Sequence, residues 1–255
     1  MAKFERRAEW IWRRRGLGEV PFSSASPRLT EETNRYVYFR HLVDVPGDIA
    51  EASAYCSADG RYQLFVNGRL VGRGPARCTP AWQYMDRYDL APYLQPGRNV
   101  IAALAHSYGR HTAWYELPSW EQLRAFGCGG FFLQGDVIAT GVGSTASPIW
   151  LDTSDGWRCL LSSAWQRDVP SGSLGFVEYY DARQAPVGWT GLDFDDSAWE
   201  MAENLRVPGR NYAGDVVPFP VMIPSDIPPL TEAPRLAEAI VRVAEVENAP
   251  PAADI

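Results

Sequence analysis

One segment in the first third of the chain, residues 55–71, constrains the fold more than any other. Three of its apolar residues alternate with their neighbours, the period of a strand with two different faces: Tyr62, Leu64 and Val66. Asn67 and Gly68 follow at once, and the apolar run resumes at residues 70–71. Asn-Gly between two strands is the strongest short-range hairpin signal, because both central residues of a type I′ turn need a positive φ. The segment therefore predicts the centre of an antiparallel sheet.

The rest of the chain continues this strand-and-turn pattern. Aromatic and β-branched residues bounded by Gly, Pro and Asn predict further strands at residues 10–12, 36–43, 49–56, 99–106, 129–138, 149–161 and 175–180. Helical periodicity is almost absent, apart from one helical turn expected at 89–97. Short, regularly spaced strands indicate an all-β protein, an antiparallel β-sandwich or jelly roll over residues 8–205.

The character of the chain changes after the last predicted strand. Seven prolines lie between residues 208 and 234, and each of them removes a backbone donor. Residues 206–255 are therefore predicted to form a Pro-rich linker and tail without regular structure.

Charge and hydropathy exclude several classes of partner. The net charge of −7 argues against a nucleic-acid partner, which needs a basic surface. Arginines do gather in residues 6–15, but Trp10, Ile11 and Trp12 interrupt them, so a strand-like segment is the preferred interpretation. No apolar run approaches the ~20 residues of a membrane span, and no apolar region follows the charged N-terminus as in a secretory signal.

The four cysteines bear on the compartment. They are widely spaced and include no C-x-x-C pair: Cys56, Cys78, Cys128 and Cys159. This spacing favours free thiols in a reducing compartment over disulfides or a metal site. The chain is expected to be cytoplasmic unless a leader was removed from it.

Two long loops are expected at residues 73–87 and 107–125, and they hold the candidate ligand-binding residues. Neutral sugars are bound by stacking on aromatic rings, with a few polar groups on the rim of the site. The loops supply both kinds of side chain: Trp82, Tyr84, Asp86, His111, Trp114, Tyr115 and Trp120. The alternative interpretation is that these aromatic residues close the ends of the sandwich and pack against other domains.

Catalytic and metal-binding patterns are not found. Glycoside hydrolysis needs two carboxylates ~5–9 Å apart across a cleft, and no spacing of the acids selects such a pair. No catalytic residue is assigned and no cofactor is expected. The acids leave a Ca²⁺ site open, but the compact D-x-D-x-D run typical of such a site is missing. The acids at 195–196 are expected to cap a turn before Trp199. Asp181 and Arg183 could face a ligand as an acid and a cation, but a buried ion pair that fixes the exit of the chain from the sheet is the preferred interpretation.

Several strings, in this order and spacing, carry a resemblance to a known family: YVYFR (36–40), SADGRY (57–62), FVNGRLVGRGP (65–75), YDLAPYL (88–94), PGRNVI (96–101), YDAR (180–183) and FDDSAW (194–199). Together they resemble the N-terminal region of bacterial α-L-rhamnosidases over about residues 10–199. The resemblance implies a galactose-binding-like β-sandwich that is not catalytic. In that family the catalytic acids lie in an (α/α)6 barrel, which these 255 residues do not match, so no catalytic role is carried over.

These observations predict an accessory or carbohydrate-binding module of an α-L-rhamnosidase-like glycoside hydrolase, either a fragment or a stand-alone protein. The expected partners are rhamnose-containing glycans and a separate or missing catalytic domain. Two alternatives stay open: a purely structural interdomain module with no ligand, and a glycoside hydrolase with an unrecognised cleft.

Overall fold

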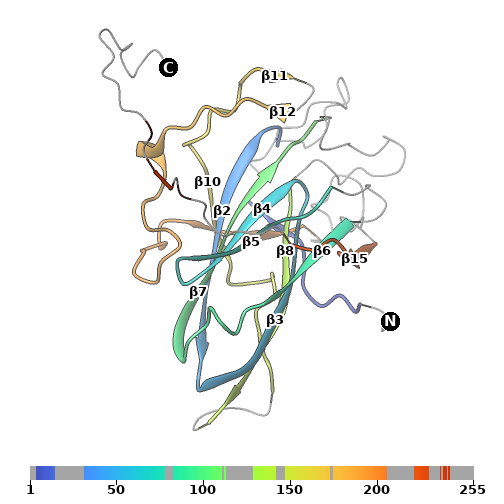
Figure 1. Ribbon diagram of the computed structural model, residues 1–255, viewed down its shortest axis with the longest axis vertical. Helices are drawn as coiled ribbons and strands as arrows, with labels where there is room; N and C mark the ends of the chain where they lie inside the picture. The colour runs from blue at the N-terminus through green and yellow to red at the C-terminus, as the bar shows by residue number, and fades with distance from the viewer. Residues whose placement is uncertain are drawn as a thin grey trace.

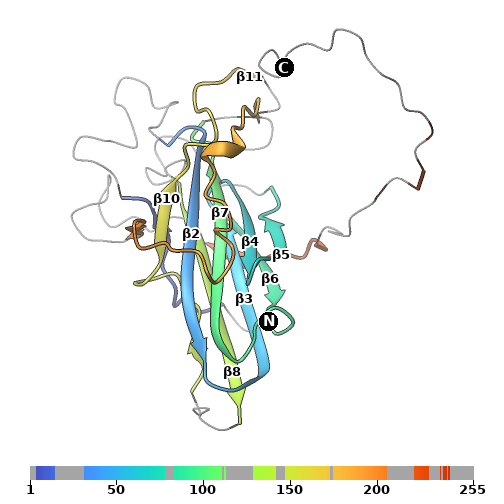
Figure 2. The same ribbon diagram turned by 90° about the vertical axis from the view of Figure 1, so that its left-hand side faces the viewer.

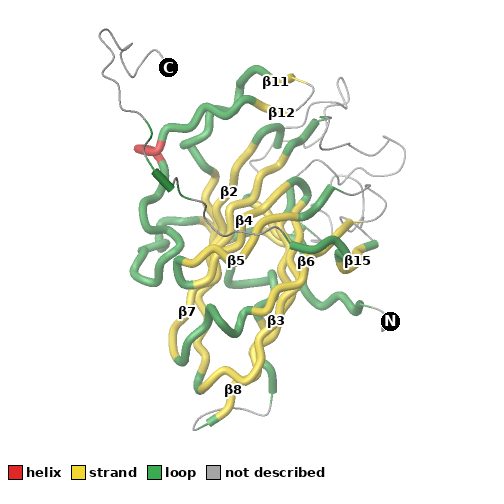
Figure 3. Tube along the Cα trace, in the orientation of Figure 1, coloured by secondary structure: helices red, strands yellow, loops and turns green. Residues whose placement is uncertain are grey.

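The computed structural model describes residues 4–14, 32–77, 83–110, 112, 129–141, 147–172, 175–205, 221–229, 236, 238–239 and 241. Within these ranges the regular structure is almost entirely β, and the single helical element is the 3-10 helix η1 (Ala182–Gln184). Figure 3 shows how strands dominate the body of the molecule. The predicted all-β fold is confirmed.

The strands form two main sheets. Sheet 1 has the order β14 (Glu203–Asn204), β1 (Ile11–Trp12), β8 (Phe131–Thr140), β3 (Asp48–Ala58), β6 (Gln83–Asp89) and β15 (Met222–Pro224), with β9 (Ile149–Trp150) also paired to β8. Sheet 2 has the order β13 (Glu200–Met201), β10 (Arg158–Leu161), β2 (Arg35–Val45), β7 (Gly97–Ser107), β4 (Arg61–Val66) and β5 (Arg69–Gly74). A short hairpin joins β11 (Ser171–Gly172) to β12 (Gly175–Phe176).

The long strands β2, β3, β7 and β8 run along the long axis of the molecule (Figures 1 and 2). The pairing of β2 with β7 extends over eleven residue pairs, from Arg35↔Ser107 to Val45↔Gly97. Every pairing between the named strands is antiparallel except that of β15 with β6. The architecture is thus the predicted sandwich of two antiparallel sheets, with one parallel strand added at an edge.

The predicted hairpin joins β4 to β5. Asn67 and Gly68 have φ of 49° and 80°, as a two-residue turn of this kind requires. Tyr62, Leu64 and Val66 face the core and are at most 2% exposed. Because successive residues of a strand point to opposite faces, Arg61 and Gln63 face outward. The hairpin therefore builds both the core and an outer surface.

Aromatic rings fill the space between the sheets. Phe39 on β2 lies 5.2 Å from Phe131 on β8 and 5.7 Å from Trp12 on β1, measured between ring centroids. Trp157 completes the group at 5.7 Å from Phe131. All four rings are fully buried, and burying each of them stabilises the fold by roughly 1.5–3 kcal/mol.

Three expectations about local structure are corrected. The loop predicted at residues 73–87 is wrong at both ends, because Arg73 and Gly74 end β5 and the segment from Gln83 onward forms β6, which pairs with β3. The strand predicted at 175–180 is reduced to β12 and an isolated bridge between Trp165 and Tyr180. The tail predicted to lack regular structure contains β15, which pairs with the edge of β6. Its Pro224 ends this strand, as expected for a residue without an N–H.

The residues expected to be structural are also located. Asp195 Oδ1 accepts a hydrogen bond from Ser197 N at 2.9 Å, and Trp199 is 7% exposed, which confirms the predicted turn. Asp181 and Arg183 form the predicted ion pair at 2.8 Å, but the arginine is largely exposed rather than buried. The pair lies on the surface because Arg183 belongs to η1, which has no buried residue, and Asp181 caps this helix.

The N-terminal arginines take part in contacts inside the protein. Arg7 bonds to Asp152 at 2.5 Å and lies 3.6 Å from the ring of Trp150. Arg13 bonds to the buried Glu32 at 2.7 Å. Among the described residues, no helix is long and apolar enough to cross a membrane.

Candidate functional site

A cavity of about 500 Å³ lies at one edge of the sandwich. Both sheets contribute to it, as does the segment that follows β15. We call it the edge pocket. Its lining combines aromatic, charged and apolar side chains: Tyr36, Arg61, Tyr62, Gln63, Arg73, Gly74, Pro75, Ala76, Asp86, Leu104, His106, Glu178, Ser225, Ile227, Pro228 and Pro229.

The outer face of sheet 2 forms one side of the edge pocket. In the strand register His106 lies opposite both Tyr36 and Arg61, so the three side chains share one face. The ring of Tyr36 stacks on His106 at 4.1 Å, and Trp165 stacks on Tyr36 at 4.3 Å. In the next row Gln63 lies opposite Arg73. The result is an aromatic column bordered by arginines.

One acid of the edge pocket, Asp86, is held by a neighbouring hydroxyl group. Tyr62 Oη donates to Asp86 Oδ2 at 2.5 Å, and the hydroxyl of Tyr88 lies 2.9 Å from that of Tyr62. Burial raises the pKa of Asp86, and the hydrogen bond from Tyr62 acts in the opposite direction. Burial also raises the pKa of Tyr62, so its hydroxyl stays protonated. The pair therefore fixes where an acceptor oxygen stands in the pocket.

A glycine makes this arrangement possible. A Cβ at Gly74 would stand 1.9 Å from Asp86 Oδ2 and 3.0 Å from the hydroxyl of Tyr62. Any side chain at this position would push the acid away from β5. The absence of a side chain at Gly74 thus permits the close approach of the two sheet edges.

The histidine of the edge pocket is neutral at pH 7. Burial and, to a smaller extent, the charge of Arg61 lower the pKa of His106 to about 3. Its Nε2 lies 3.0 Å from Asn34 Oδ1. The amide nitrogen of Asn34 donates to the carbonyl of Arg167 at 2.9 Å, which orients the amide oxygen toward His106. His106 therefore donates from Nε2 and serves as part of the aromatic column, not as a cation.

The structure brings only part of the predicted set together. Asp86 lines the edge pocket. Tyr84 lies on β6 rather than on a loop and is not among the lining residues; its carbonyl accepts from Ser57 Oγ at 2.7 Å. The remaining predicted residues lie outside the described residues: Trp82, His111, Trp114, Tyr115 and Trp120.

Several pocket residues were not predicted as site residues. The most informative are the outward-facing ones, Arg61 and Gln63, because the alternation that places Tyr62 in the core also places them on the surface. The sequence therefore held a signal for this side of the pocket. No local signal links Glu178 to it.

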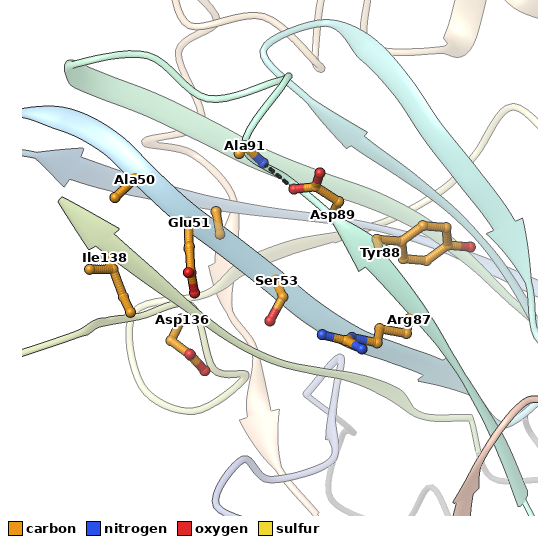
Figure 4. A pocket seen from close by; sticks show the side chains of 10 residues that line it. Ala50, Glu51, Ser53, Arg87, Tyr88, Asp89, Ala91, Asp136 and Ile138 are labelled. Carbon is orange, nitrogen blue, oxygen red and sulfur yellow. Dashed lines mark hydrogen bonds between the residues drawn. The ribbon is translucent and has the colours of Figure 1, made fainter.

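A second groove, also of about 500 Å³, lies on the outer face of sheet 1 over β3, β6 and β8. Figure 4 shows the acids Glu51, Asp89 and Asp136 around Ser53, with the side chain of Arg87 nearby. The carboxylate of Asp89 accepts from the backbone N of Ala91 at 3.0 Å. Among the described residues, no three His, Cys, Asp or Glu side chains form a group that could hold a metal ion. This groove has no aromatic column, so it is the weaker candidate for sugar binding.

The fold and the edge pocket define a β-sandwich module with a concave polar and aromatic site. Comparison with known families identifies the module. The family described as "Alpha-L-rhamnosidase N-terminal domain" matches residues 47–221, and the chain belongs to this family. The predicted resemblance is confirmed.

The matched relatives are much longer proteins. An α-L-rhamnosidase of Formosa agariphila is 23% identical over 192 residues, covering 71% of this chain and 19% of the relative. One of Streptomyces avermitilis is 30% identical over 171 residues, covering 63% of this chain and 15% of the relative. A crystal structure of a GH78 family rhamnosidase of Bacillus sp. GL1 has a TM-score of 0.66 at 29% identity, covering 89% of this chain and 20% of that chain. The matched part of this chain thus corresponds to the N-terminal domain of the relatives and not to their catalytic domain, and the chain spans only 15–20% of their length.

Proposed function

We propose that this chain is a non-catalytic accessory module of an α-L-rhamnosidase-like glycoside hydrolase, and that its edge pocket binds rhamnose-containing glycans. The observation that carries the proposal is a cavity of about 500 Å³ that joins the stacked rings of Tyr36 and His106 to two arginines and two acids. Sugars present apolar C–H faces and a rim of hydroxyl groups, and concave sites that combine aromatic and polar groups match both.

The charges of the edge pocket suit a neutral ligand. Arg61 and Arg73 can donate to hydroxyl oxygens, while Asp86 and Glu178 can accept from hydroxyl protons. Each such hydrogen bond contributes only ~1 kcal/mol net. These hydrogen bonds therefore determine the orientation of the sugar more than the affinity for it. We expect a weak affinity, with a Kd of ~0.1–1 mM, equivalent to about −4 to −5.5 kcal/mol.

Titration of the chain with L-rhamnose, followed by tryptophan fluorescence and by amide NMR shifts, tests the proposal. Arg73→Gln removes the positive charge and most of the N–H donors of this side chain, and should weaken binding at least fivefold, on the order of 1 kcal/mol. Arg87→Gln is the matched control, because this arginine lies on the other groove. A parent chain that binds neither L-rhamnose nor rhamnose-containing oligosaccharides at ~10 mM would refute the proposal.

Ligand binding by Trp82 and Trp114 stays a prediction, and Trp82→Ala and Trp114→Ala belong in the same titrations.

The non-catalytic assignment has its own test. The chain alone should release no nitrophenol from an aryl α-L-rhamnoside. A rate that scales with the concentration of the chain and is lost in Asp86→Asn would contradict it.

The alternative function, an interdomain packing module without a ligand, is favoured by one observation. Apolar side chains in one stretch after β12 are exposed: Val177 by 49%, Tyr179 by 52%, Tyr180 by 49% and Val187 by 88%. Such surfaces are typical of contacts with another domain or protein. This function replaces the first one if the titrations show no binding.

The cytoplasmic location also stays a proposal, supported by the free buried thiols of Cys56 and Cys159.

A further inference from the structure

Residues 221–229, which we call the strap, are attached to the sandwich by backbone pairing. Strand β15 lies beside β6 (Figure 1), with Met222 opposite Gln83. Gln83 N donates to the carbonyl of Val221 at 3.0 Å, and Ser225 N donates to the carbonyl of Met85 at 2.9 Å. The next residue of β6 is Asp86, so the strap continues directly into the edge pocket.

Apart from Ser225, the residues of the strap that line the pocket are apolar: Ile227, Pro228 and Pro229. Pro228 and Pro229 have no backbone N–H. The N–H of Ile227 is already used, because it donates to Ser225 Oγ at 3.3 Å. Ile227 is nevertheless 49% exposed and lines the cavity, so its side chain is available for contact with a ligand. Residues 227–229 of the strap thus form an apolar wall.

The charged groups of the pocket come from the sheets and from Glu178, and the strap adds only the hydroxyl group of Ser225. Arg61 and Arg73 belong to sheet 2, and Asp86 belongs to sheet 1. A ligand that fits this arrangement has hydroxyl groups on most of its rim and one apolar corner. A 6-deoxyhexose has this chemistry, because a methyl group replaces the hydroxymethyl group of the ordinary sugar.

We infer that the strap makes the edge pocket selective for 6-deoxy sugars, with Ile227 as the specificity-determining residue that contacts the C6 methyl group. The inference rests on the proposed function and goes beyond it, since it assigns the basis of selectivity to a segment at and after the end of the family match. Removing one methyl from water changes an affinity by about fourfold, and an added hydroxyl facing carbon lowers it further. We expect L-rhamnose to bind about five to ten times more tightly than L-mannose, which differs only by the hydroxyl at C6.

The experiment titrates the full chain with L-rhamnose and L-mannose and compares three variants. Ile227→Ser should bring the affinity ratio of the two sugars close to one, mainly by weakening L-rhamnose. Ile227→Val keeps an apolar side chain and should retain most of the selectivity. Ile138→Ser is the matched control, an isoleucine exposed to a similar degree (42%) on the outer face of the other sheet, and should keep the ratio unchanged.

The outcomes separate the two proposals. Equal affinity of the parent for both sugars, or an unchanged ratio in Ile227→Ser, overturns the role of the strap and leaves the proposed function standing. Failure of the parent to bind either sugar overturns both. Selectivity that is lost in Ile227→Ser and kept in Ile138→Ser supports the inference.

Discussion

Replacing His106 with glutamine should remove most of the acid sensitivity that the edge pocket gives to the fold. In the folded protein this histidine stacks on Tyr36 and donates from Nε2 to Asn34 Oδ1 at 3.0 Å. Protonation would place a second proton, and a positive charge, in a buried position close to Arg61. The structure therefore favours the neutral ring.

The magnitude follows from linkage between protonation and folding. The pKa of His106 is lowered from 6.5 to about 3, first by burial and then by Arg61. Between these two values the unfolded chain binds a proton that the folded chain does not, so the free energy of unfolding falls as the pH falls below 6.5. This single group should cost ~2 kcal/mol of stability at pH 5 and ~4 kcal/mol at pH 3, relative to pH 8.

Urea unfolding followed by tryptophan fluorescence at pH 8, 6 and 5 measures the effect. His106→Gln retains a donor for Asn34 but does not titrate. Between pH 8 and pH 5 the parent should lose about 2 kcal/mol more than the variant. The imidazole resonances of His106 should stay those of a neutral ring down to pH 5. An identical pH dependence of the two proteins, or a ring that titrates near pH 6.5, would refute the reasoning.

Three further changes test other parts of the structure. Arg40 is fully buried and lies 2.8 Å from Asp196; Asp196→Asn removes its counter-charge and should lower the free energy of unfolding by about 3 kcal/mol, and equal urea midpoints would contradict this. Gly74→Ala places a Cβ against Asp86 and should cost about 1–3 kcal/mol, so an unchanged thermal midpoint would count against the packing described. Cys56 and Cys159 are buried, and burial raises the pKa of both thiols. If all four cysteines of the sequence are free, four equivalents of thiol should react with Ellman's reagent in denaturant without reductant. Two equivalents or none would show disulfides.

The parts of the fold that could be predicted are those with local causes. The β4–β5 hairpin depends on the positive φ of Asn67 and Gly68 and on the alternation that begins at Tyr62. Strand β6 could not be predicted in the same way. Its polar and charged residues resemble a loop, and it is a strand because Cys56 of β3 pairs with Asp86 and continues the ladder. Long-range pairing here decides what local propensity does not.

The same distinction explains how much of the candidate site could be predicted. Asp86 can be predicted as a site residue because an acid among aromatic residues is a local signal. The contact between Asp86 and Tyr62 cannot be predicted in this way, because the two residues lie on different sheets and meet only after the sheets pack. Glu178 reaches the same cavity from a segment that is far away in sequence. A binding site at a sheet edge depends on packing between sheets, which periodicity within a strand does not describe.

The strap extends the edge pocket beyond the residues of the family match. The family match ends at residue 221, while the apolar wall is built by residues 227–229. The polar groups Arg61, Arg73 and Asp86 lie inside the matched region. A relative can therefore share the sandwich and its polar groups while differing in the wall. Selectivity among sugars would then change through a few residues attached to one edge of β6, without any change in the two sheets that hold the rest of the pocket.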